Sequence, residues 1–418
     1  MAQGTSPLSD VFRNNILFRL RAGQNVSRAT YTRASTATYA NQNSVLIPAA
    51  SGNLRVEWVD LDGDGVRETP SYLFEGARTQ KVTDPENFTP WTNFGTPIVT
   101  SGQADPFGGT AGYLVEDDNA ASPEGRWEVV PFTGDGIKAI GYHVRQNTAA
   151  AFSLALFDNT AASYRIIVIG TWNAAGVPVL SINTGAGSLF TPQRIGNWWW
   201  VTVSANGVIA ANTNQTRFFA ADIANAPVGK TYFFGANAWD APYPASYQGP
   251  SGGATVRAAD AYSVPFNWSP CDCTVLARVA RPLHADATGT LGQNPRIFEI
   301  GTASSALIGN FNSTARQFVG QIDTPTTDAT QTASIPAGTS LTTTWQFKNL
   351  TTGGSVAIDT GTGLSAFSSA ATAFSAFGNQ TLRIGGSGGD ELYGGLMDLL
   401  IVRGLLSRDR MIQLAGIL

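Results

Sequence analysis

Short apolar runs separated by turn-rich stretches recur along most of the chain, whereas helical periodicity is almost absent. Many short strands at this spacing are typical of β-sandwiches and jelly rolls. One helix is expected at the end of the chain, where Ser407 can cap it and Met411, Leu414, Ile417 and Leu418 fall roughly on one face. The expected strands cover residues 164–172, 198–207, 231–241, 273–282, 296–302, 342–350, 355–360, 381–386 and 396–404.

Two turn-rich passages divide the strand-bearing regions. "TDPENFTPW", near residue 85, separates an N-terminal strip from the first sandwich, and "QGPSGGATVRAADAYSVPFN" separates two strand-rich blocks. The sequence therefore predicts an all-β protein with two β-sandwich (jelly-roll) domains, an N-terminal anchoring strip and a short C-terminal helix. The expected regions are 1–84 for the N-terminal connector, 85–265 for the first sandwich and 266–418 for the second.

Charge argues against nucleic acid as a partner, and hydropathy argues against insertion into a membrane. Charged residues make up 13% of the chain, about half the usual share. The formal net charge is −4, and no basic stretch is long enough to follow a phosphate backbone, so nucleic acid is not an expected partner. No apolar run approaches the roughly 20 residues of a membrane helix, so membrane insertion is not expected. The start "MAQGTSPLSD" does not resemble a signal peptide, and we expect synthesis in a cytoplasm and release by a route such as lysis.

The stretch "DLDGDGVRETP", which begins at Asp60, starts with the spacing of a calcium loop. Asp60, Asp62 and Asp64 alternate, and Gly65 stands at the sixth position, where a calcium loop turns sharply. The twelfth position, a bidentate Glu in an EF-hand, is Ser71, so the stretch is not an EF-hand. Two interpretations stay open: a looser Ca²⁺ site with the three aspartates as ligands, or a β-hairpin turn favoured by Asp-Gly pairs. Under either interpretation the loop lies in a connector. Calcium, if bound there, would stiffen a joint and would not take part in a reaction.

The sequence gives no positive sign of catalysis. Its two histidines, His143 and His284, lie in different blocks, and no serine has a nucleophile-elbow context. The metal-binding spacings HExxH and paired CxxC are absent. Glycoside hydrolysis needs two carboxylates about 5 to 10 Å apart, and no strand carries a Glu-x-Asp-x-Glu pattern. We therefore expect no enzymatic activity and keep a polysaccharide depolymerase as the alternative, since carboxylates from distant strands can also meet.

Aromatic residues are the better lead toward a ligand, because sugars stack their apolar faces on flat rings. Trp198, Trp199 and Trp200 follow one another on one expected strand, so Trp199 faces opposite to its neighbours. A second aromatic group comprises Trp239, Tyr243 and Tyr247. Residues of this kind lie in a core or a subunit interface more often than in a sugar platform, so none of them is assigned to a ligand site.

Three longer segments carry a resemblance. "YTRASTATYANQNSVLIPAASGNLRVEW", followed by "YLFEGARTQ", and the later "GANAWDAPYPASYQGPSGGATVRAAD" together resemble modular tail, fibre and other virion proteins of bacteriophages, the latter segment resembling the exit of their carbohydrate-binding-module-like sandwich. "DELYGGLMDLLIVRGLLSRDRMIQL" resembles the last strand and helix of a laminin-G or concanavalin-type jelly roll. Gln80 stands where the family usually has Asn. After Tyr247, where the family has a bulky residue, this chain has Gln248-Gly249. The matching positions of the first two segments are Arg33, Ala34, Ser35, Thr36, Ala37, Thr38, Tyr39, Glu75, Ala77, Arg78, Thr79, Ser246, Tyr247, Pro250, Thr255, Arg257, Ala258, Ala259 and Asp260.

This resemblance implies a non-enzymatic structural protein of the virion, such as a tail fibre, a head fibre or a capsid decoration subunit. Its partners would be other virion proteins and host-surface glycans, and a symmetric homo-oligomer is expected, with a trimer favoured. A third hypothesis is a plain carbohydrate-binding module of a bacterial surface protein, which would bind glycans without a place in a particle. The apolar residues expected to anchor the chain to a particle are Phe12, Ile16, Leu17, Phe18 and Leu20.

Four charged residues within the resembling segments are expected to be structural. These four residues are Arg33, Arg78, Arg257 and Asp260. The fork of an arginine guanidinium can bridge two loops by bidentate hydrogen bonds. We therefore expect these residues to hold the N-terminal strip against the first sandwich and not to bind a ligand.

Overall fold

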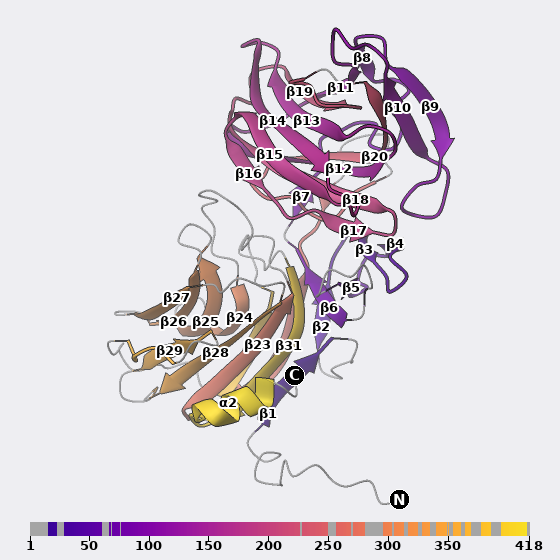
Figure 1. Ribbon diagram of the computed structural model, residues 1–418. Coiled ribbons are helices and arrows are strands. Elements are labelled where there is room, and N and C mark those ends of the chain that lie inside the picture. The colour runs from indigo at the N-terminus through magenta and orange to yellow at the C-terminus, as the bar shows by residue number, and fades with distance from the viewer. Residues whose placement is uncertain are drawn as a thin grey trace, which may run out of the picture.

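The chain forms two β-sandwiches, which lie one above the other in Figure 1. Strands make up nearly all of its regular structure, so the predicted all-β fold class is confirmed. Among the described residues there is one short helix. The computed structural model describes residues 16–22, 29–60, 67, 69–75, 77–225, 228–249, 256–268, 271–280, 296–302, 305–312, 317–324, 328–334, 340–348, 350, 354–360, 364–368, 378–385 and 394–415.

The first sandwich, at the top of Figure 1, consists of a seven-stranded and a six-stranded antiparallel sheet. The seven-stranded sheet has the order β16 (Gly187–Leu189), β18 (Trp198–Val208), β12 (Gly136–Gln146), β20 (Gly229–Trp239), β10 (Gly112–Asp117) and β9 (Ile98–Gln103), with β17 (Gln193–Ile195) also on β18. The six-stranded sheet has the order β15 (Pro178–Gly185), β14 (Ser163–Trp172), β13 (Ala151–Asp158), β19 (Asn214–Phe219), β11 (Gly125–Val130) and β8 (Thr92–Phe94).

Alternating side chains explain how this sandwich closes. In β14, Ile166 and Val168 contribute to the main core, whereas Ile167 between them belongs to a separate cluster. This alternation is the period of two that a strand imposes on its side chains. Aromatic rings from both sheets meet in the core, where Phe218 and Phe233 are stacked with ring centroids 4.3 Å apart.

The second sandwich consists of two seven-stranded antiparallel sheets. One has the order β29 (Ser355–Asp359), β28 (Ser340–Lys348), β23 (Cys273–Ala280), β31 (Gly394–Arg403), β6 (Thr69–Phe74) and β5 (Val56–Val59), with β1 (Ile16–Arg21) also on β31. The other has the order β2 (Thr30–Thr32), β22 (Ala261–Trp268), β30 (Gly378–Ile384), β24 (Arg296–Thr302), β25 (Ser305–Asn312), β26 (Gln317–Asp323) and β27 (Ala329–Ser334).

The N-terminal strip is built into the second sandwich. One edge of β31 pairs with β6 near its start and with β1 further along, and β2 extends the opposite sheet. Phe18 and Leu20, expected to anchor the chain to a particle, are instead buried in the core of this sandwich because β1 forms part of its sheet. The expected boundary between residues 265 and 266 falls inside β22, which pairs with β30 on both sides of that point. The second sandwich thus combines residues from both ends of the chain.

A small hairpin extends the N-terminal strip onto the first sandwich. It is formed by β3 (Ala37–Ala40) and β4 (Leu46–Ala49). Leu46 joins an apolar cluster with Trp198 and Trp200, and the Thr38 hydroxyl donates a hydrogen bond of 2.7 Å to the Tyr247 carbonyl. The segment that leaves the first sandwich also pairs with the strip, through β7 (Arg78–Thr79) and β21 (Val256–Arg257). The strip therefore contacts both sandwiches.

The helix α2 (Arg408–Ala415) ends the described chain. It follows Ser407, whose carbonyl accepts a 3.0 Å hydrogen bond from the Met411 amide, so the helix predicted from this signal is confirmed. Met411 is buried and lies 3.6 Å from the Gln346 side-chain amide of β28. Ile417 and Leu418 lie outside the described residues. Within the described part of the chain, no helix is long and apolar enough to cross a membrane.

Candidate functional site

A buried cluster of charges lies where the N-terminal strip meets the segment that leaves the first sandwich. Arg55 pairs with Glu75 and Asp260, and its guanidinium also donates to the Ser246 hydroxyl at 2.9 Å. Arg257 lies 2.9 Å from Glu75. These side chains are almost completely buried, Ser246 excepted. We call Arg33, Arg55, Glu75, Arg257 and Asp260 the joint cluster.

The joint cluster satisfies its buried carboxylates from several directions. Asp260 accepts a 2.9 Å hydrogen bond from the Glu75 amide and lies 3.2 Å from Arg33. Burial by itself would raise the pKa of Glu75, but Arg257, Arg55 and the Ser246 hydroxyl lower it to about 2. Burial likewise opposes the charge of Arg55, yet the two carboxylates raise its pKa above the ordinary value. Each charge is therefore stabilised by an opposite one, as buried charges require.

Three of the four charged motif residues meet in this cluster, and one does not. Arg33, Arg257 and Asp260 come together as predicted. The guanidinium of Arg78 instead lies over the ring of Tyr243, 5.8 Å from the centroid. The central residue, Arg55, was not singled out from the sequence. The sequence offers one indication of its importance, because Arg55 is the single arginine in the weakly charged run "SGNLRVEW".

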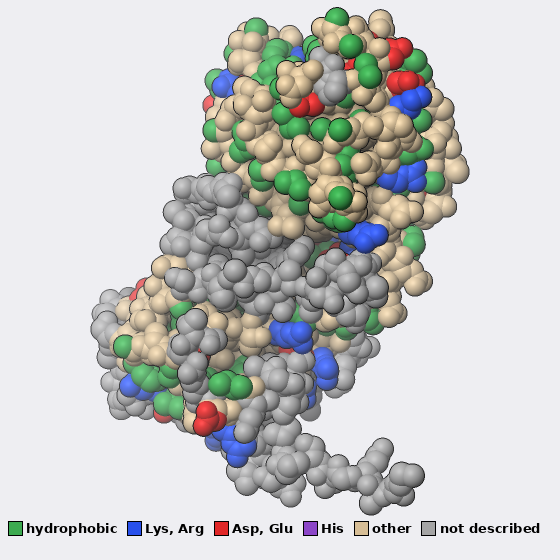
Figure 2. Space-filling model, viewed as in Figure 1, with side chains coloured by type: hydrophobic (Ala, Val, Ile, Leu, Met, Phe, Trp, Pro, Cys, Tyr) green, Lys and Arg blue, Asp and Glu red, His purple; other side chains and the backbone are tan. Residues whose placement is uncertain are grey.

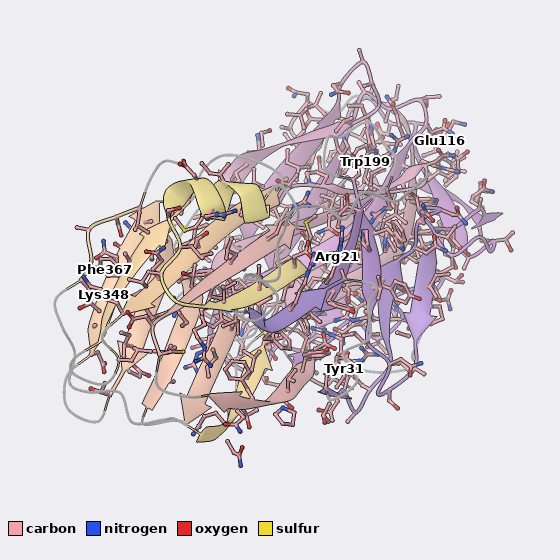
Figure 3. The ribbon with its side chains drawn as sticks, turned by 90° about the horizontal axis from the view of Figure 1, so that it is seen from below. Arg21, Tyr31, Glu116, Trp199, Lys348 and Phe367 are labelled. Carbon is pink, nitrogen blue, oxygen red and sulfur yellow. The ribbon has the colours of Figure 1, made fainter. Side chains whose placement is uncertain are left out.

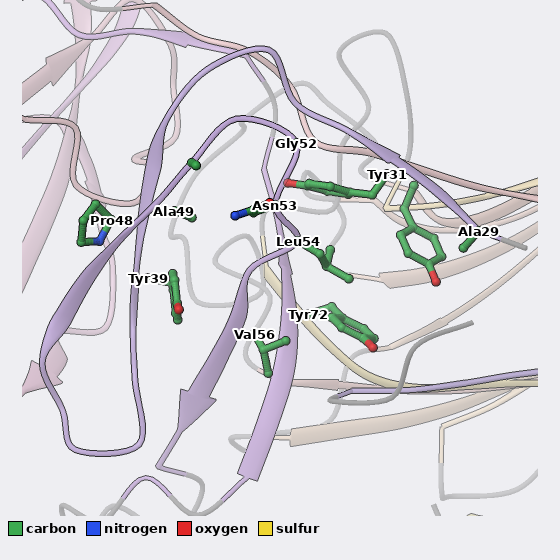
Figure 4. Close-up of a pocket in the computed structure, with 12 residues that line it drawn as sticks. Ala29, Tyr31, Tyr39, Pro48, Ala49, Gly52, Asn53, Leu54, Val56 and Tyr72 are labelled. Atoms are coloured by element: carbon green, nitrogen blue, oxygen red, sulfur yellow. The ribbon is translucent and has the colours of Figure 1, made fainter. Parts of the chain in front are cut away.

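A cavity of about 560 Å³ lies beside the joint cluster, and Figure 4 shows the residues around it. Tyr31 connects the two features: its hydroxyl donates to Asp260, and Arg33 donates to the same hydroxyl at 2.5 Å. Four tyrosines contribute to the wall, and none of the lining residues that the structure describes is charged. The lining residues of this tyrosine cavity are Ala29, Tyr31, Tyr39, Pro48, Ala49, Ala50, Gly52, Asn53, Leu54, Val56, Tyr72 and Tyr262.

A second cavity, of about 410 Å³, lies between the two sandwiches. Its wall includes Trp199, which Figure 3 places in the first sandwich, and Glu57 of β5. Arg67 spans this interlobe cleft, donating to the carbonyls of Trp58 and Arg194. Burial raises the pKa of Glu57 although Arg67, 3.8 Å away, opposes that effect. The cleft therefore holds a protonatable carboxyl group and an aromatic wall.

The aspartate loop is only partly described. Asp60 follows β5 and lines the interlobe cleft, whereas Asp62 and Asp64 lie outside the described residues. No group of three metal-ligating side chains occurs among the residues that the structure describes. Calcium binding by Asp60, Asp62 and Asp64 and a simple hairpin turn both stay predictions.

The histidine that the structure describes is part of a core. His143 is fully buried, and its ring lies 4.4 Å from that of Trp200 and 5.2 Å from that of Tyr247. Burial lowers its pKa to about 3, so the imidazole is neutral near pH 7. Trp198, Trp200, Trp239, Tyr243 and Tyr247 are also buried, as expected for core residues, while Trp199 faces the other way and is partly buried. His284 lies outside the described residues.

Charged side chains of the described surface are scattered on the face that Figure 2 shows, and several are paired. On the face shown in Figure 2, Lys, Arg, Asp and Glu side chains are scattered among neutral and apolar ones. Several described charges are paired, such as Lys81 and Lys138, which both contact Asp240. This arrangement agrees with the low charged fraction of the sequence.

Comparisons with known proteins do not place the chain in a family. No family model matches it, and no curated protein matches it. Among solved structures, the chain is similar to domains LG4-5 of the mouse laminin alpha1 chain, with 10% sequence identity and a TM-score of 0.22, over 81% of this chain and 92% of that chain. A TM-score this low carries no argument. The assignment to the class of two-sandwich β-proteins rests on the sheets and cores described above.

Proposed function

We propose that this chain is a non-enzymatic structural protein of a bacteriophage virion, a tail fibre, head fibre or capsid decoration subunit that projects two β-sandwiches. The joint cluster is the observation that carries this proposal. Arg33, Glu75, Arg257 and Asp260 all belong to the segments that resemble virion proteins. In the structure they are buried and paired with one another. Such side chains cannot reach a substrate, so a structural role suits them.

In this proposal the protein acts by assembly and binding and not by catalysis. The N-terminal strip adds strands to the second sandwich and an apolar hairpin to the first, and the joint cluster lies between these contacts. A body held in this way can present its faces to other virion proteins and to host-surface glycans. The protein would be assembled in the host cytoplasm, released by lysis and located in the virion. We propose a homo-oligomer, with a trimer favoured, which sedimentation should report as three times the chain mass of 44.0 kDa.

The polysaccharide depolymerase is the second candidate, and the interlobe cleft favours it. Glu57, with its raised pKa, lines the cleft together with Glu75, whose pKa is lowered. Carboxylates with pKa values pushed apart often serve as acid and base. Glu75, however, is held by two arginines and Ser246, which leaves it poorly placed to attack a sugar. Shortening of a capsule polysaccharide by the wild type, lost in Glu57→Gln, would favour this candidate over the first.

The leading proposal is tested in purified particles. Bacteria producing the phage are lysed, the particles are purified through a density gradient, and the chain is quantified by mass spectrometry and located by gold-labelled antibodies. We expect it in every particle, in a fixed ratio to the capsid protein and at one type of position. A chain that stays in the soluble lysate and is absent from purified particles contradicts the proposal.

A further inference from the structure

We propose that the tyrosine cavity binds a neutral glycan, a saccharide without carboxylate, sulfate or phosphate groups. This inference rests on the proposed function, to which it adds a binding site and a ligand class. The volume of about 560 Å³ falls within the range of about 300 to 1,000 Å³ for sites that hold small ligands.

The N-terminal strip and the second sandwich build this cavity together. Tyr31 comes from β2, Tyr39 from β3, Tyr72 from β6 and Tyr262 from β22. In Figure 4, Tyr31, Tyr39 and Tyr72 surround a hollow from different elements. The turn that carries Asn53 closes another side, held by a 2.8 Å hydrogen bond from the Gly52 amide to the Arg33 carbonyl. The site therefore forms only when the strip is docked.

The rings at this site are of two kinds. Tyr72 and Tyr262 are nearly fully buried and stacked on each other, with centroids 6.3 Å apart and an interplanar angle of 26°. These two stacked rings form a rigid floor of the cavity. Tyr31 and Tyr39 are half-buried and so keep part of each ring accessible. A ring with one apolar face and a polar end suits a pyranose, which has C–H groups on its faces and hydroxyls at its edges.

Tyr31 is held in place before any ligand arrives. Its hydroxyl donates to Asp260 and accepts from Arg33, while Arg33 also donates to the Ala50 carbonyl at 2.7 Å. Burial and the Asp260 carboxylate raise the pKa of Tyr31, so its hydroxyl stays protonated. A preorganised ring loses little conformational freedom on binding, and this favours affinity.

The uncharged side chains of the described wall indicate the ligand class. Among the residues that the structure describes, none that lines the cavity is charged, and Arg33 and Asp260 beside it have fully buried side chains that are paired with each other. An anionic sugar would bring its charge against a described wall of uncharged side chains, which costs free energy. A neutral saccharide needs only stacking and hydroxyl hydrogen bonds, for which Asn53 adds an exposed amide.

The test uses the full-length chain and two sets of immobilised and soluble oligosaccharides. One set contains neutral glucose, galactose, mannose and N-acetylhexosamine units, and the other contains uronic or sialic acid units of similar length. We expect saturation-transfer NMR and calorimetry to detect binding to at least one neutral oligosaccharide, and Tyr39→Ala to weaken it about tenfold. Asn53→Trp, which places a large ring at an exposed position of the mouth, should abolish binding without touching the core.

The control is Tyr164→Ala, which removes a half-buried tyrosine of the first sandwich and should leave the affinity unchanged. Circular dichroism and thermal unfolding show whether each variant folds; Asn53→Trp remains informative if Tyr39→Ala does not. Binding to no neutral member, binding to the acidic set alone, or neutral binding that Asn53→Trp leaves intact would each overturn the inference. A chain present in particles that binds no neutral glycan refutes this inference alone, whereas absence from particles refutes the proposed function.

Discussion

At the scale of single residues, Arg55 is the centre of the joint cluster. It contacts Glu75, Asp260, Ser246 and the Thr38 carbonyl, and so joins the N-terminal strip to the segment that leaves the first sandwich. Its guanidinium places a positive charge between two buried carboxylates. A residue of this kind is hard to replace, because a buried carboxylate that loses its partner keeps its desolvation cost.

We predict that Arg55→Ala lowers the free energy of unfolding by about 3 to 5 kcal/mol, because Glu75 and Asp260 lose a buried partner. Chemical denaturation followed by tryptophan fluorescence measures the change. Arg55→Lys should recover only part of it, since an ammonium cannot contact both carboxylates through a planar fork. The matched control is the exposed Arg194, whose replacement by Ala should change stability by less than about 0.5 kcal/mol. Equal effects at the two positions would contradict the role given to Arg55.

His143 gives a second prediction at this scale, concerning pH. Its pKa is lowered to about 3 in the folded protein, whereas an unfolded histidine titrates near pH 6.5. The unfolded state therefore binds a proton first, and folding stability falls as the pH drops from 6.5 toward 3. This group alone should make the protein about 2 kcal/mol less stable at pH 5 than at pH 7.

Unfolding curves of the wild type and of His143→Phe, measured at pH 7, 6 and 5, test this prediction. Phenylalanine suits the aromatic surroundings of Trp200, Phe234 and Tyr247 and cannot be protonated. The variant should lose less stability than the wild type over this interval. Parallel pH profiles for the two proteins would show that His143 does not titrate on unfolding.

At the scale of elements, strands were easier to predict than their partners. The expected run 296–302 coincides with β24, and 164–172 and 198–207 differ from β14 and β18 by one residue at one end. Alternation of apolar residues determines these strands locally. The pairing of β1 and β6 with β31 depends instead on residues more than three hundred positions away. No local pattern reports such a partner, so the strip was expected to be a separate connector.

The same limit applies to the candidate sites. The motif residues Arg33, Arg257 and Asp260 were expected to be structural, and their side chains do meet. The tyrosine cavity could not be foreseen, because Tyr31 and Tyr262 come from strands that are distant in sequence and that only the fold brings together. The tryptophan run is the more visible feature of the sequence, yet Trp198 and Trp200 belong to one apolar cluster and Trp199 packs, partly buried, against another.

Glycine at position 125 gives a prediction for β11. This strand lies between β19 and β8, and a β-carbon added at Gly125 would lie 2.0 Å from the Phe218 carbonyl oxygen. Because that obstacle is backbone, Gly125→Ala should displace the pairing and destabilise the protein by about 1 to 3 kcal/mol. Gly134→Ala, where the added carbon meets nothing within 4 Å, is the matched control and should be nearly neutral. Thermal unfolding compares the two; a neutral Gly125→Ala would contradict the register of β11 and β19.

At the scale of the whole molecule, two sandwiches with separate cores are connected by the N-terminal strip and by the segment that leaves the first sandwich. The cores themselves share no described residues. Among the described residues, contacts that connect them include the hairpin of β3 and β4, Arg67 across the interlobe cleft, the pairing of β7 with β21 and the joint cluster. Although the chain has few charged residues, five of them are concentrated in the joint cluster at this connection. We infer that these contacts make the two sandwiches one cooperative body.

Differential scanning calorimetry of the full-length chain tests this claim most directly. If the joint couples the sandwiches, the wild type unfolds in one transition whose calorimetric and van't Hoff enthalpies agree, and Arg55→Ala unfolds in two, one for each sandwich. A wild type that already shows two independent transitions, or an Arg55→Ala variant that keeps a single one, would contradict the account.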